Sequence, residues 1–80
     1  MDRGQLLEHL AEAERHVEQA EANVLRQREL LEKLRLGGHE AAVQHAVELL
    51  KHLEDSRALY IAQRDRLRDE FNSGDAGPTH

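Results

Sequence analysis

Hydrophobic residues recur along the first half of the chain at alternating steps of four and three residues. The series consists of Leu6, Leu10, Ala13, Val17, Ala20, Val24, Gln27, Leu31 and Leu34. This spacing is a heptad repeat, in which the side chains at positions a and d share one face of a helix. Gln27 is the one polar member of the series. We therefore predict a long amphipathic helix over about residues 3–36, opened by Asp2 as its N-cap.

The same steps return after the neighbouring glycines Gly37 and Gly38. The residues at these steps are Val43, Ala46, Leu50, Leu53, Arg57, Tyr60, Arg64, Leu67 and Phe71. A second helix is therefore predicted over about residues 39–72, and residues 1–72 form one helical domain. Residues 73–80 are small and polar and include a proline, which predicts a disordered tail.

The glycine pair predicts a turn at residues 37–38. Two glycines inside one continuous helix would cost about 2 kcal/mol, whereas a glycine at the left-handed position after a helix costs little, a role that suits Gly37. In an antiparallel hairpin each a residue faces a d residue, and only a pairing whose residue numbers add up to 77 centres the turn on these glycines. This pairing places Arg57 over the small Ala20, with Glu21 and Glu54 in reach of its guanidinium.

Large apolar residues also lie beside the seam of a and d residues. Leu7, Val47 and Ile61 fall at position e, and Leu30 and Leu49 fall at position g. A stripe of this width suits a four-helix bundle, and a chain of 80 residues leaves much of its surface exposed. We predict a homodimer with these five residues in its interface. The alternatives are a monomer whose flanking leucines broaden the seam, and a larger or mixed assembly.

Composition narrows the functional classes. The chain has a net charge of −5 and no cysteine, which excludes disulfides and thiolate chemistry. It lacks a signal-peptide core and an apolar run of about 20 residues, so a cytoplasmic location and no membrane partner are expected. Acidic and basic residues alternate over residues 64–70, which is typical of a solvated helix and not of a nucleic-acid surface. There is no phosphate-binding glycine loop or other catalytic motif, so no enzymatic activity and no cofactor are predicted.

Six histidines are the unusual feature of the composition. His45, Glu48 and His52 follow at i, i+3 and i+7, a spacing at which a helix can present metal ligands. Metal sites of helical bundles project inward, however, whereas His45 and His52 fall at outward c positions, so the three are weak candidates and solvated histidines are the simpler interpretation. His9 faces Glu70 across the predicted hairpin, where a hydrogen bond or a pH-sensitive rim is an option.

Three segments of the chain are LLEHLAEAERHV at 6–17, RQRELLEKL at 26–34 and AQRDRL at 62–67. With these segments the chain resembles a group of small uncharacterised bacterial helical-hairpin proteins. The likeness spans about residues 5–70, although Gln63 stands where the group tends to have Asp. The resemblance implies that the hairpin is the whole protein, and it implies no activity.

The sequence as a whole predicts an all-α antiparallel two-helix coiled coil that dimerises into a four-helix bundle. Its predicted function is that of a non-enzymatic structural or interaction module, with a further protein partner left open. The alternative is a helical bundle that binds a metal or a small ligand through surface histidines. Two interpretations of Gln27 remain open. Its side chain is buried in the seam and fixes the register of the two helices, or it bends to the surface.

Overall fold

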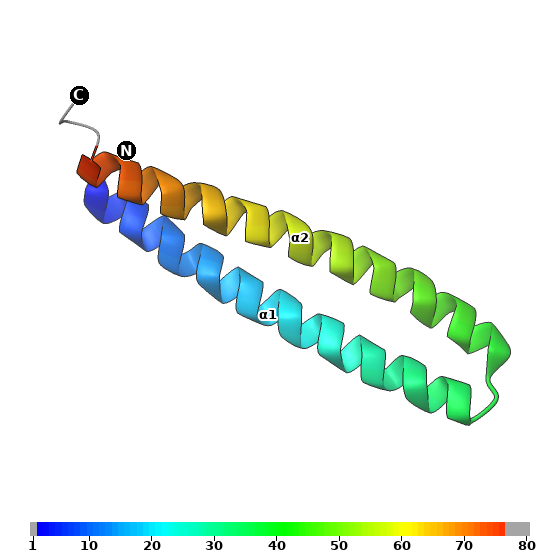
Figure 1. The fold of residues 1–80 in the computed structure, drawn as a ribbon. Helices are drawn as coiled ribbons and strands as arrows, with labels where there is room; N and C mark the ends of the chain where they lie inside the picture. Colours follow the sequence, from blue (N-terminus) through cyan, green and yellow to red (C-terminus); the bar gives the residue numbers. More distant parts are fainter. Residues whose placement is uncertain (1, 77–80) are drawn as a thin grey trace.

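The computed structural model describes residues 2–76, which form two helices packed against each other. Helix α1 covers Arg3–Leu36 and helix α2 covers Glu40–Ala76. The helices run antiparallel, so the start of α1 and the end of α2 lie at the same end of the molecule (Figure 1). The result is a rod of 61 × 18 × 15 Å. The predicted helical hairpin is thereby confirmed.

Helix α1 has the predicted bounds, and local hydrogen bonds explain both ends. The Asp2 carboxylate accepts a hydrogen bond from the backbone N–H of Gln5 at 2.7 Å, which satisfies one of the free donors of the first turn. At the other end the N–H of His39 donates to the carbonyl of Leu34 at 3.1 Å, and the N–H of Gly38 donates to that of Arg35 at 3.2 Å. This pair of bonds is a Schellman motif, which closes the last turn of the helix.

The left-handed residue of the turn is Gly38, not Gly37 as the sequence suggested. Gly37 keeps a helical conformation, with φ −83° and ψ −7°, and its N–H still donates to the carbonyl of Lys33. Gly38 has φ +74° and reverses the chain. The helical hydrogen bonds therefore include the first glycine as their last donor, and the second glycine takes the conformation that other residues avoid.

Helix α2 continues to Ala76, beyond the predicted end near residue 72. Residues 73–76 are thus helical and do not belong to the predicted disordered tail. The reason is that a glycine within a helix costs about 1 kcal/mol but does not forbid the conformation, so Gly74 is a weak stop signal. Residues 77–80 of that predicted tail lie outside the described residues.

The core is the seam between the helices, and it follows the predicted heptad. On α1 the buried side chains are Leu6, Ala13, Val17, Ala20, Val24, Gln27 and Leu31. On α2 only Ala46 is buried among the described side chains, and the remaining seam residues are half-buried except for Tyr60, which is 38% exposed. The difference arises because four of the nine seam residues of α1 are small alanines and valines, which the larger residues of α2 cover while their own outer atoms remain in solvent.

Candidate functional site

One long side of the hairpin carries ion pairs between the helices. Arg28 of α1 contacts Glu54 of α2 at 2.9 Å, and Arg68 of α2 contacts Glu14 of α1 at 3.2 Å. All four residues occupy e positions, which face each other in an antiparallel pair. We call this side the charged face, formed by Glu14, Glu21, Arg28, Arg35, Glu54 and Arg68, with Leu7, Val47 and Ile61 between them.

The ion pair between Arg28 and Glu54 replaces an arrangement that the sequence suggested. Glu54 was expected to share Arg57 with Glu21, whereas the structure pairs Glu54 with Arg28. The physical reason is that Arg28 and Glu54 stand opposite each other at e positions, while Arg57 lies in the seam and is half-buried there. The side chains of the pair are 51% and 38% exposed, so water screens much of their attraction.

The opposite long side holds the residues at position g and has a different composition. We call it the neutral face, formed by His9, His16, Asn23, Leu30, Ala42, Leu49, Ser56 and Gln63. None of these is an acid, a lysine or an arginine. Glu70 is the one carboxylate at a g position of α2 and lies near the open end of the rod.

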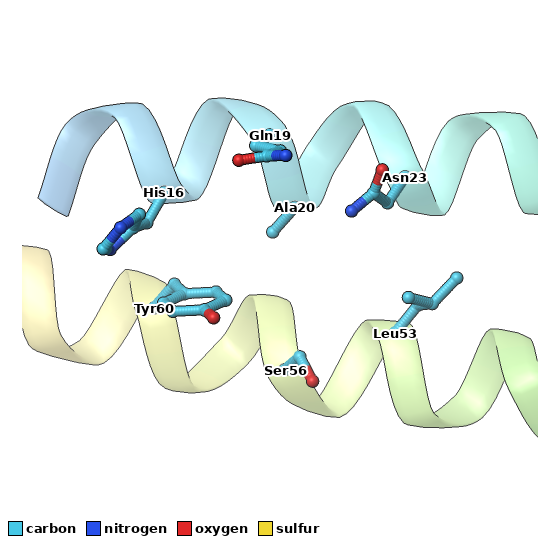
Figure 2. Close-up of a pocket in the computed structure, with 7 residues that line it drawn as sticks. All are labelled: His16, Gln19, Ala20, Asn23, Leu53, Ser56 and Tyr60. Atoms are coloured by element: carbon cyan, nitrogen blue, oxygen red, sulfur yellow. The ribbon is translucent and has the colours of Figure 1, made fainter. Parts of the chain in front are cut away.

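A groove of about 330 Å³ opens on the neutral face midway along the hairpin. Ala20, Leu53 and Tyr60 form its apolar floor, and its polar edge consists of His16, Gln19, Asn23 and Ser56. Figure 2 shows Ala20 on α1 pointing toward α2, where its short side chain leaves the space unfilled. The His16 and Tyr60 rings close one end, with centroids 5.3 Å apart and an angle of 47° between their planes.

The five residues predicted for the dimer interface do not form a single patch. Leu30 and Leu49 lie on the neutral face and are 46% and 47% exposed. Leu7 and Val47 are exposed on the charged face, and Ile61 is half-buried there. The e and g positions lie on opposite sides of the seam, so a single flat interface includes only one of these two sets.

Two exposed residues near the groove were not part of the predicted interface. Leu59 is 72% exposed at a c position, which borders the g positions of its helix, and Tyr60 is the most exposed seam residue of α2. The signal for Leu59 was present in the sequence, because c and g positions share one side of a helix. The exposure of Tyr60 depends on the small size of Ala20 opposite, which only the packing of the two helices reveals.

The histidines do not assemble into a metal centre within the described part of the chain. His45, Glu48 and His52 are all exposed, and no three His, Asp or Glu side chains of residues 2–76 are placed to hold a metal ion. No hydrogen bond joins His9 to Glu70 in the same range. At that end of the rod the guanidinium of Arg3 instead lies 4.0 Å from the ring centroid of Phe71, a cation–π contact between the two helices.

Comparisons with protein-family models, with curated proteins and with solved structures gave no match for this chain. Neither of the two described helices is apolar over a stretch long enough to cross a bilayer.

Proposed function

We propose that this protein is a non-enzymatic self-association module, in which two hairpins meet through their neutral faces and form a four-helix bundle. The observation that carries the proposal is the pair Leu30 and Leu49, nearly half exposed on a face without strong charges. Burial of the remaining surface of each leucine would contribute about 1 kcal/mol, and a symmetric dimer buries four of them.

The small core of the hairpin supports the proposal. Only seven apolar side chains are buried among the described residues, all of them in one narrow seam. A single seam leaves little apolar area to offset the conformational entropy of ordering two long helices. A second seam between two hairpins would add buried apolar area, as in a four-helix bundle.

Charge favours the neutral face over the other surfaces. The chain has a net charge of −5, so two copies repel each other when acidic surfaces meet. The outward f positions of α2, which include Glu48, Asp55 and Asp69, are strongly acidic. Contact through the neutral face keeps these carboxylates in solvent and leaves the charged faces free for a further protein partner.

The proposal is tested with the double substitution Leu30→Glu and Leu49→Glu, which places two carboxylates on the neutral face of each copy. We expect light scattering to show a dimer for the unmodified protein and a monomer for the variant. Far-ultraviolet circular dichroism should show that the variant remains helical, because neither leucine belongs to the seam within the hairpin.

The matched control is Leu7→Glu with Val47→Glu, which makes the same chemical change on the charged face. This variant should remain a dimer. A monomeric unmodified protein at concentrations near 100 µM would overturn the proposal, and dissociation of the control alone would assign the interface to the charged face.

A further inference from the structure

We infer that Leu30 and Leu49 of one copy fill the groove at Ala20 and Tyr60 of the other, so that the two hairpins lie antiparallel and staggered in the dimer. This inference rests on the proposed dimer and adds its geometry. We call Leu30 and Leu49 together the leucine ridge, since both stand at g positions, one on each helix, at nearly the same height along the rod.

The ridge and the groove lie on the same face, separated by a short distance along the rod. In the pairing around the turn, Leu49 stands level with Arg28 and Ser56 stands level with Glu21. The two features are therefore about seven residues apart, or about 10 Å at a rise of 1.5 Å per residue. The ridge lies nearer to the turn, and the groove lies nearer to the middle of the rod.

A two-fold axis between these features brings each ridge onto the groove of the other copy. The axis crosses the rod near the layer of Val24 and Leu53, and the symmetry makes the same contact twice. The floor of the groove, formed by Ala20, Leu53 and Tyr60, is apolar and matches leucine side chains. Asn23 lies close to the axis, where its amide meets that of Asn23 in the other copy, and Ser56 lies against Leu49 of the other copy. The groove volume of about 330 Å³ accommodates both leucines.

Other symmetric arrangements match these surfaces less well. Two hairpins that meet in parallel place groove against groove and ridge against ridge, which leaves a void at one height and crowds the leucines at the other. An antiparallel pair with full overlap places each ridge over the level of His9 and Gln63, away from the groove, so the leucines are not received by the space beside Ala20. The staggered arrangement is the one that places each leucine ridge on the apolar floor formed by Ala20, Leu53 and Tyr60.

The area of contact is sufficient for a stable dimer. The staggered overlap extends from the axis to the turn on each side and covers about 40 Å of the rod, and the face is 18 Å wide. The two copies together would then bury about 1,400 Å², which is above the roughly 1,000 Å² that separates specific interfaces from incidental contacts.

The chain has no cysteine, so engineered disulfides report the arrangement without background. We would prepare the full chain with Leu49→Cys and Ser56→Cys together, oxidise it mildly and determine its mass under non-reducing conditions. Within one copy the two cysteines lie seven residues apart on the same helix, about 10 Å, which is beyond the reach of a disulfide. A covalent dimer is expected from the double variant and not from either single variant.

The single variants distinguish the competing arrangements. Cross-linking through Leu49→Cys alone would mean that the axis passes through the ridge, and cross-linking through Ser56→Cys alone would mean that groove faces groove. Either result overturns the inference. A dimer in light scattering without any cross-link overturns it as well, and a monomeric unmodified protein overturns the proposed function itself.

A second measurement tests the groove without disulfides. Ser56→Trp places a large ring in the groove from an exposed position, so the hairpin should still fold. We expect dimer dissociation to become at least tenfold easier, with unchanged helicity. Ala58→Trp, which adds a ring at an exposed position on the side of the charged face, is the matched control and should leave the dissociation constant unchanged. Equal dissociation constants for the two variants would overturn the inference.

Discussion

The side chain of Gln27 on α1 donates a hydrogen bond from Nε2 to the backbone carbonyl of Ala46 on α2, at 3.1 Å. Both residues are buried, with Gln27 only 8% exposed, so the bond lies inside the seam and away from water. Of the two interpretations of Gln27, the structure therefore excludes the one in which the side chain bends to the surface. This bond connects residue 27 of α1 to residue 46 of α2, as expected of a residue that fixes the register of the two helices.

Replacing Gln27 with Leu should change stability by less than about 1 kcal/mol, because the carbonyl of Ala46 retains its bond within α2 and the apolar side chain suits the seam. Replacing Gln27 with Glu should cost about 2–3 kcal/mol at pH 7, since a buried carboxylate would face a carbonyl oxygen. Urea unfolding at a fixed protein concentration measures both changes.

The same Gln27→Glu variant has a characteristic pH dependence. Burial and the nearby carbonyl would raise the pKa of the introduced carboxyl group in the folded state above its value in the unfolded chain. The folded state then binds the proton more tightly, so the penalty is absent at low pH and grows as the pH rises through the folded-state pKa. If the difference between this variant and Gln27→Leu did not change between pH 4 and pH 7, residue 27 would not be buried.

The two glycines of the turn should respond differently to substitution by alanine. Gly38 has φ +74°, so Gly38→Ala should cost about 1–2 kcal/mol, and Gly38→Asn should cost less. Gly37 is helical, and an added Cβ would lie 2.8 Å from Cδ2 of His39, the movable end of a side chain. Gly37→Ala should therefore change stability by less than about 0.5 kcal/mol. Thermal unfolding compares the two, and a larger cost at Gly37 would contradict the observed turn.

The ion pairs of the charged face should contribute little compared with the seam. Arg28→Gln or Glu54→Gln should each lower stability by less than about 1 kcal/mol, because both side chains of this pair are substantially exposed. Val24→Ala should cost about 2 kcal/mol, since Val24 is 1% exposed and its lost methyl groups leave a cavity. Chemical unfolding in low and high salt checks the ranking, and a cost at Arg28 equal to that at Val24 would contradict it.

Zinc should leave the unfolding temperature unchanged within about 1 °C, because His45, Glu48 and His52 are exposed and no third ligand of the described chain joins any two of them. The measurement compares an untagged protein in excess zinc and in excess chelator. His45→Ala with His52→Ala is the matched variant, and zinc-dependent stabilisation that disappears in it would support the metal-binding alternative instead.

The heptad of hydrophobic residues determined the two helices, the seam and the position of the turn, because the side-chain period of a helix is a local property that sequence records directly. The same rule placed Leu30 and Leu49 on one side and Leu7 and Val47 on the other. It did not identify which glycine reverses the chain, because that depends on where the last helical hydrogen bond forms. Nor did it locate the end of α2, since Gly74 weakens a helix without ending it.

Only the tertiary structure decided how side chains from the two helices combine. The ion pair of Arg28 with Glu54, the bond from Gln27 to Ala46 and the groove beside Ala20 all require both helices at a defined distance and height. Each depends on the volumes of residues far apart in the chain, such as Ala20 and Tyr60. The hydrophobic period of a single helix carries no information on how two such residues pack together. For this reason the sequence determined the hairpin, whereas the contrast between a charged face closed by ion pairs and a neutral face with a groove emerged only from the packing.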